Sequence, residues 1–230
     1  MASSGALRSR ASARPSRYFR LLAALLVVVA ASTLYFSYEE AVLPTSSPSF
    51  PSALAGSSIS LSLMLPLIAL TYLTSRGLPL AGALRSLGLG KGKLSITTIV
   101  TIGIGVFLAI LGVEIALSLF QAVTNISLPT NVQSLLQGQA LYYIVFAALI
   151  GPINEEIFFR GFLVPRFGIV LSALLFMMLH SGYASVAELI GAFVFGLLAG
   201  YVFKRTGSLY TTIIGHILVN SMALFFIMAI

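Results

Sequence analysis

The chain has 230 residues, of which 58% are hydrophobic and 8% are charged, and its formal net charge is +7. Soluble globular domains carry about 25% charged residues, so this composition excludes a soluble globule and indicates a protein with several membrane spans. The positive charge does not indicate nucleic-acid binding, because the basic residues occur in short clusters beside apolar segments. Such clusters are typical of topology signals.

Windows of about 20 apolar residues are long enough to cross the hydrocarbon core of a bilayer. The sequence predicts seven such segments, the fifth of them short, at residues 21–38, 55–75, 95–119, 138–163, 168–181, 184–203 and 209–230. The predicted fold class is therefore all-α, a polytopic bundle of transmembrane helices. The first segment is too long for a typical signal peptide, so we expect it to be a retained anchor.

The positive-inside rule predicts the orientation of this bundle. All 13 lysines and arginines fall in the N-terminal region or in alternate connections, at 76–93, 160–166 and 204–205. The other connections, which include 44–58 and 121–137, hold none. We therefore predict an integral, multi-pass protein of the cell membrane with a cytoplasmic N-terminus and its C-terminus on the opposite side.

The chain divides into three predicted parts. Residues 1–17 are rich in arginine and serine and are predicted to form a disordered basic tail. Residues 18–137 are predicted to form N-terminal transmembrane helices and loops. Residues 138–230 are predicted to form a helical core that holds the candidate chemistry. The chain lacks cysteine and aspartate, which excludes disulfides, cysteine nucleophiles and paired catalytic aspartates.

An adjacent pair of glutamates lies inside an apolar segment of the core. Ionisable groups at bilayer depth cost about 2.5 to 3.5 kcal/mol each on insertion scales, so their presence there indicates a function or a partner. Glu156 precedes Arg160 by four residues, the spacing of an acid–base pair on one helical face. Adjacent residues on a helix point about 100° apart, so Glu155 is free to face elsewhere and to act as a general base.

Both histidines of the chain also lie inside apolar segments. His180 follows Phe176 by one helical turn, and Asn220 follows His216 by one turn. At about 1.5 Å per residue, these groups and Glu155 have compatible depths when counted from the predicted cytoplasmic ends of their helices. We therefore expect the four groups to meet in one pocket that opens to the cytoplasm.

The residues taken singly leave other interpretations open. Glu114 fits an interhelical hydrogen-bonding strut, Glu188 fits an interfacial position, and the glutamate–arginine pair fits a folding clamp. The alternative to an enzyme is a non-catalytic membrane protein, either a proton-coupled transporter that relays protons through Glu155 and His180 or a bacteriocin-immunity scaffold. A transporter is expected to show inverted repeats, and none is evident in the sequence.

Three short motifs of the amino-acid sequence resemble those of a known family. Glu155-Glu156-x-x-x-Arg160, Phe176-x-x-x-His180 and His216-x-x-x-Asn220, in that order on successive helices, are similar to the motifs of the CPBP intramembrane proteases. This family, also called Abi or CAAX-protease-like, includes CAAX prenyl endopeptidases and bacteriocin-processing or self-immunity proteins. The resemblance covers about residues 138–230. Other membrane proteases fit less well, because the sequence lacks both His-Glu-x-x-His and Gly-x-Ser-Gly.

The resemblance implies a role for each position. Glu155 and His180 would hold and activate the attacking water, while His216 and Asn220 would donate hydrogen bonds to the tetrahedral oxyanion. Glu156, Arg160 and Phe176 would orient these groups. No cofactor is favoured, although Glu155, His180 and His216 could nominally form a zinc site, as in a metalloprotease.

The sequence thus predicts an intramembrane endopeptidase of the CAAX-protease type. A water molecule activated by a glutamate and a histidine would hydrolyse a peptide bond at a site open to the cytoplasmic face. The implied partners are a peptide or protein substrate, with a prenylated C-terminus as one option, and membrane lipid. No nucleic-acid partner is expected.

Overall fold

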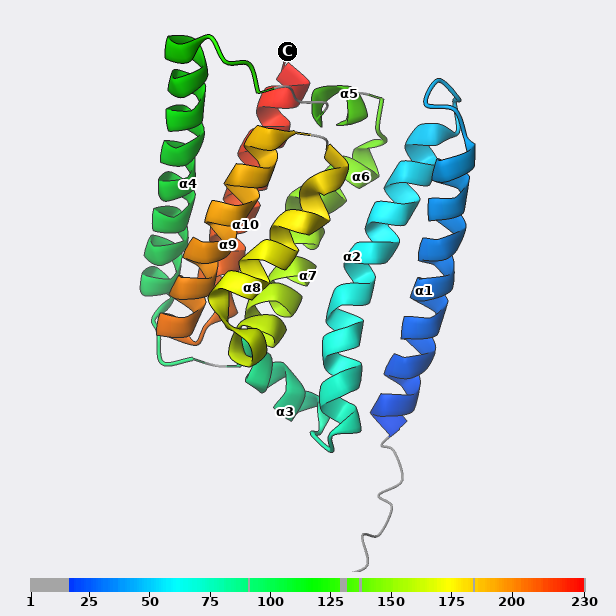
Figure 1. The fold of residues 1–230 in the computed structure, drawn as a ribbon. Coiled ribbons are helices and arrows are strands. Elements are labelled where there is room, and N and C mark those ends of the chain that lie inside the picture. Colours follow the sequence, from blue (N-terminus) through cyan, green and yellow to red (C-terminus); the bar gives the residue numbers. More distant parts are fainter. Residues whose placement is uncertain (1–16, 91, 129–131, 137, 184, 230) are drawn as a thin grey trace, which may run out of the picture.

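The computed structural model describes residues 17–90, 92–128, 132–136, 138–183 and 185–229, which form helices and contain no strand (Figure 1). The long helices are α1 (Arg17–Val42), α2 (Phe50–Ser75), α4 (Ile96–Thr124), α8 (Val164–Leu179), α9 (Val186–Thr206) and α10 (Leu209–Ala229). The short helical segments are α3 (Leu80–Leu84), η1 (Arg85–Leu89), α5 (Val132–Leu136), α6 (Leu141–Val145), η2 (Phe146–Ile150), α7 (Gly151–Glu155), η3 (Glu156–Leu163) and η4 (His180–Tyr183). The predicted all-α class is confirmed. The predicted basic tail at 1–17 lies outside the described residues, except for Arg17.

Six helical stretches of the described chain are long and apolar enough to cross a membrane. One of them, Leu141–Tyr183, has 43 residues and contains most of the fourth predicted segment and all of the fifth. It is broken at Gly168, whose φ of 84° lies in the left-handed region that glycine adopts without steric cost. Figure 1 shows α8 returning beside α7 after this break, and α8 packs against η3. The sequence-based count of seven treats these two arms as separate crossings.

The two ends of the bundle differ in their connections (Figure 1). One end, which we call the basic end, holds the start of α1, the α2–α3 connection with Arg76, and the last turn of α9 with Lys204 and Arg205. The other end, which we call the distal end, holds the α1–α2 connection, α5 and the last turn of α10. The described chain therefore starts and finishes at opposite ends of the bundle, as the predicted topology requires.

Small residues bring the helices into close contact. A Cβ atom placed on Gly103 of α4 would lie 2.6 Å from Ile214 of α10, and one on Gly215 of α10 would lie 2.7 Å from Val106 of α4. A Cβ atom on Gly196 of α9 would lie 2.8 Å from a side-chain atom of α8. Packing of this kind is how helices associate in lipid, where no hydrophobic effect drives them together.

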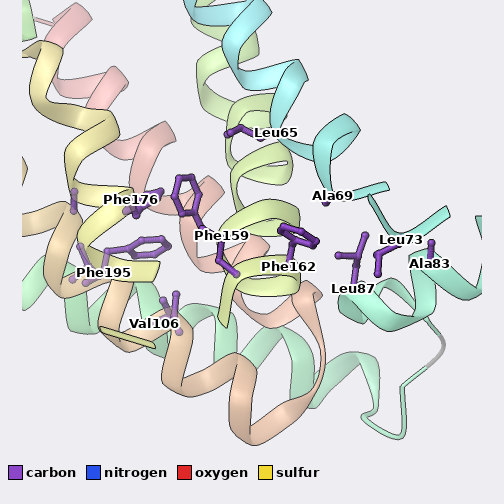
Figure 2. Close-up of a cluster of buried hydrophobic side chains, with 14 residues drawn as sticks. Leu65, Ala69, Leu73, Ala83, Leu87, Val106, Phe159, Phe162, Phe176 and Phe195 are labelled. Carbon is purple, nitrogen blue, oxygen red and sulfur yellow. The ribbon is translucent and has the colours of Figure 1, made fainter. Parts of the chain in front are cut away.

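The largest buried apolar cluster lies between the middle of the bundle and its basic end (Figure 2). Its members from α2 and the α3–η1 segment include Leu73 and Leu87, and the latter is fully buried. The phenylalanines Phe159 and Phe162 of η3 pack into the same cluster, together with Phe176 of α8. This core joins the N-terminal helices to the helices that carry the three sequence motifs.

Candidate active site

Glu156 forms the predicted ion pair with Arg160 on one face of η3. Their Oε1 and Nη1 atoms are 3.1 Å apart, and the side chains are 0% and 1% exposed. The sequence analysis placed Arg160 in a cytoplasmic turn as a topology signal, and this placement is wrong, because the guanidinium is inside the bundle. An arginine so deeply buried needs its carboxylate partner, since an unpaired charge in the interior is strongly unfavourable.

Two aromatic rings enclose the guanidinium of Arg160. Its Cζ atom lies 4.3 Å from the centre of the Phe176 ring and 4.8 Å from that of Phe195. The quadrupole of an aromatic ring attracts a cation over its face, and this attraction is stronger where water is excluded. Phe176 therefore contributes to the site by holding Arg160 and, through it, Glu156.

His216 of α10 connects the two glutamates of the first motif. Its Nδ1 atom lies 2.9 Å from Oε1 of Glu156, and its Nε2 atom lies 3.7 Å from Oε2 of Glu155. Because Glu156 is a hydrogen-bond acceptor here, Nδ1 carries the proton of this contact and Nε2 is directed to Glu155. With Arg160 charged, neutrality of the buried cluster needs one further proton on His216 or Glu155. His216 and Glu155 are thus arranged to share this proton.

The two glutamates differ in exposure and in contact with a cavity. Glu156 is fully buried, whereas the Glu155 side chain is 17% exposed and lines a cavity. The local reason is the helix period, which turns adjacent side chains to different faces. The backbone here is π-helical over Glu156–Leu163, a wide turn that is rare and frequent at functional sites.

His180 follows the last turn of α8 and begins η4. Its Nδ1 atom lies 2.9 Å from the backbone carbonyl oxygen of Phe176, and the centres of the His180 and Phe176 rings are 4.5 Å apart with their planes tilted by 49°. A carbonyl can only accept, so Nδ1–H donates and Nε2 is left with its lone pair. The ring is therefore fixed in orientation, with one nitrogen available to a substrate or a water.

Asn220 lies one turn after His216 on α10, as the sequence predicts. Its Nδ2 atom donates to the carbonyl of Ala147 at 3.0 Å, within the π-helical segment η2. This bond uses one of the two amide hydrogens of Asn220 and holds α10 against η2. The second hydrogen remains for other acceptors.

Two cavities reach the candidate residues and share His180 in their linings. Cavity 1 has a volume of about 320 Å³ and also contacts Glu155 and Tyr143. Cavity 2 has a volume of about 250 Å³ and also contacts His216 and Asn220. The structure therefore brings Glu155, His180, His216 and Asn220 to one region, although the expected single pocket is divided in two.

The position of these cavities bears on the side from which the candidate site is reached. Cavity 1 is lined by the C-terminal part of α1, the N-terminal half of α2, α5, the start of α6 and the α8–η4 junction, all of which face the distal end. It reaches the surface there, because its lining residues Ser37 and Gly182 are exposed. The sequence analysis expects a pocket that opens to the cytoplasm, and this stays a prediction. Depth counting locates a residue along a helix, but it does not show at which end side-chain packing closes the bundle.

Sequence reasoning missed a buried polar contact beside the site. Asn154 of α7 donates from Nδ2 to Oγ of Ser62 on α2 at 3.1 Å, and both side chains are buried. An amide directly before the glutamate pair in an apolar segment was a signal for such an interhelical bond. Glu114 and Glu188, which were interpreted as a strut and an interfacial residue, both line cavity 2.

Glu155, His180 and His216 were the nominal zinc ligands. Within the described parts of the chain, no three histidine, cysteine, aspartate or glutamate side chains form a group that could hold a metal ion. In this arrangement Nδ1 of His216 is bonded to Glu156, and Nδ1 of His180 is bonded to a backbone carbonyl. These three side chains do not converge on one point as tetrahedral zinc ligands would.

Comparisons with known proteins agree with the motif region. Residues 137–222 match the family described as type II CAAX prenyl endopeptidase Rce1-like. An uncharacterized 24.3 kDa protein of Escherichia coli is 26% identical over 159 residues, which are 65% of this chain and 69% of that protein. No solved structure matches the chain. The predicted resemblance of the three motifs to the CPBP, or CAAX-protease, family is thereby confirmed over residues 137–222 of this integral, multi-pass membrane protein.

Proposed function

We propose that the protein is an intramembrane endopeptidase that hydrolyses a peptide bond with a water activated by Glu155 and His180. The observation that carries the proposal is the position of His216 between Glu155 and Glu156, next to two cavities that share His180. Buried titratable groups that converge at a cavity are typical of active sites. The family match over residues 137–222 supports the same class of reaction.

The first step assigned to the site is attack by water. Glu155 faces cavity 1 with room for a water, and its carboxylate removes one proton from that water as the oxygen attacks the carbonyl carbon of the substrate. His180 holds the water with Nε2, because its Nδ1 is already bonded to the carbonyl of Phe176. The proton on Glu155 then passes to the leaving amine as the C–N bond breaks, so the carboxylate is regenerated.

Stabilisation of the tetrahedral oxyanion is assigned to His216 and Asn220. Glu156 accepts from Nδ1 of His216, so a protonated ring would present Nε2–H to the oxyanion. Asn220 would use the amide hydrogen that Ala147 does not engage. Neither role requires a metal, and Arg160 acts only through its ion pair with Glu156.

The test compares membranes that contain wild-type protein with membranes that contain Glu155→Gln. New C-termini that appear only with the wild-type chain would identify both the activity and its substrates. The matched control is Glu39→Gln, which removes a carboxylate of α1 that accepts a hydrogen bond from the hydroxyl of Tyr35 and that does not line either cavity. If both variants give the same peptide termini as wild type, the protein is not a protease of this mechanism, and substrate flux in proteoliposomes would then favour the transporter.

A further inference from the structure

The basic residues mark one side of the bundle. Arg76 lies in the α2–α3 connection at the basic end, Arg166 lies in the first turn of α8, and Lys204 and Arg205 lie in the last turn of α9. The distal connection 43–49 holds no lysine or arginine. Cytoplasmic loops carry the excess of lysine and arginine in membrane proteins. The basic end is therefore assigned to the cytoplasm and the distal end to the opposite side.

Both cavities lie in the half of the bundle nearer to the distal end. Cavity 1 contacts Ser37 near the end of α1 and Gly182 in η4, and both residues are exposed. Cavity 2 contacts Glu188, which lies in the first turn of α9, and Ala223 in the later half of α10. The candidate residues are thus connected to the surface from this side.

The opposite direction is closed by packed side chains (Figure 2). Leu87 of η1 and Leu209 of α10 are fully buried, and Phe159 and Phe162 of η3 belong to the same buried apolar cluster as Leu87. A Cβ atom on Gly161 would lie 2.6 Å from the carbonyl oxygen of Leu87, so the backbones of η3 and η1 are in direct contact. Protein interiors packed in this way leave no passage for a peptide.

The lining of cavity 1 indicates what it admits. Most of its residues carry hydroxyl, carboxyl or imidazole groups, including Thr33, Ser57, Ser58 and Tyr183, and none is a lysine or arginine. Such a surface can hydrogen-bond to the backbone of an extended peptide and to water.

We infer that the protein takes its substrate from the extracytoplasmic side, as a polypeptide segment that enters cavity 1. The inference rests on the proposed function, and it differs from a cytoplasmic site for prenylated C-termini. It assigns the substrate to proteins that expose a segment beyond the outer face of the membrane.

Single-cysteine labelling tests the side of entry without any need for activity. The chain has no cysteine, so each introduced thiol is the sole target of a membrane-impermeant maleimide. Gly182→Cys reports on cavity 1, and a Cβ atom there meets no atom within 4 Å. Ser52→Cys reports on the distal surface outside both cavities, and Ser75→Cys reports on the basic end of α2. Each variant is labelled in intact cells and in inverted membrane vesicles.

The expected result is labelling of Gly182→Cys and Ser52→Cys in intact cells, with Ser75→Cys labelled in inverted vesicles only. Labelling of Gly182→Cys from the same side as Ser75→Cys, or from neither side, would overturn the inference. So would labelling of Ser75→Cys in intact cells, because the bundle would then be inverted.

The cleavage products give an independent readout of the same inference. New C-termini that depend on Glu155 should map to segments on the extracytoplasmic side of their proteins. If they map to cytoplasmic prenylated tails, the inference fails while the proposed protease function stands. If no Glu155-dependent termini are found although Gly182→Cys is labelled from outside, the protease function fails while the side of access stands.

Discussion

Nδ1 of His216 lies 2.9 Å from Oε1 of Glu156, a contact between residues that are 60 positions apart in the chain. It joins α10 to η3 and uses the one glutamate of the pair that has no access to a cavity. As a result, the other nitrogen of His216 faces Glu155, the glutamate that does line a cavity. Two adjacent residues of the same type thus have different surroundings, and the predictions below separate their roles.

Glu155→Gln is expected to abolish cleavage and to leave the folded bundle intact. The amide keeps the shape of the side chain but cannot accept the proton of the attacking water, and loss of general base catalysis typically costs about 10² to 10⁴ in rate. The measurement is the yield of Glu155-dependent peptide termini, with unfolding in detergent as the control for the fold. A well-folded Glu155→Gln protein that cleaves at the wild-type rate would exclude this residue as the base.

Arg160→Ala is expected to destabilise the protein as well as inactivate it. Without the guanidinium, Glu156 is a buried charge that keeps only His216 as a partner, and breaking a buried ion pair typically costs about 3 to 5 kcal/mol. Chemical unfolding in detergent micelles measures this loss.

The matched control for this prediction is Arg166→Ala. Arg166 lies on the same stretch of chain, but it is exposed and contacts Phe162 and Tyr72 near the surface. We expect its removal to change the free energy of unfolding much less. An Arg160→Ala protein as stable as Arg166→Ala but inactive would instead place Arg160 in the substrate site.

Part of this site could be predicted from the sequence because it depends on the helix period alone. The Glu156–Arg160 pair and the separation of Glu155 from it follow from 3.6 residues per turn, even though the segment is π-helical in detail. The all-α class and the length of the apolar segments also follow from local composition.

The remaining features depend on which helices meet and in which register. The contact of His216 with Glu156 and the bond of Asn154 to Ser62 join residues that are 60 and 92 positions apart. No local pattern fixes such distances. The side on which the cavities reach the surface also depends on packing, since the fully buried Leu87 belongs to a short basic segment that looked like a surface loop.

Gly161→Ala is expected to destabilise the bundle by about 1 to 3 kcal/mol, the usual cost of overpacking a filled interior. Its Cβ atom would lie 2.6 Å from the carbonyl oxygen of Leu87, which is backbone and cannot rotate away. Gly105→Ala on α4 is the control, because a Cβ atom there meets nothing within 4 Å. Thermal unfolding in detergent should separate the two variants, and equal stabilities would contradict the close contact of η3 with η1.

Zinc chelators are expected to leave the cleavage activity unchanged, since the proposed mechanism uses Glu155 and His180 with no metal. Metal content of the purified protein, measured by elemental analysis, provides a second readout that does not depend on activity. Loss of activity on chelation, followed by recovery with zinc, would show that Glu155, His180 and His216 rearrange to bind the ion.

The bond between Asn154 and Ser62 is expected to stabilise the contact of α7 with α2 and so to hold Glu155, the next residue, in the wall of cavity 1. A double-mutant cycle with Asn154→Ala and Ser62→Ala should give a coupling energy of about 0.6 kcal/mol, with about 1.7 kcal/mol as the upper range for interhelical hydrogen bonds in membranes. Both single variants should also lower the cleavage rate more than their loss of stability explains, because they release the helix that carries the base. A coupling energy of zero would show that the two side chains do not interact, and unchanged cleavage in both variants would show that α2 does not position Glu155.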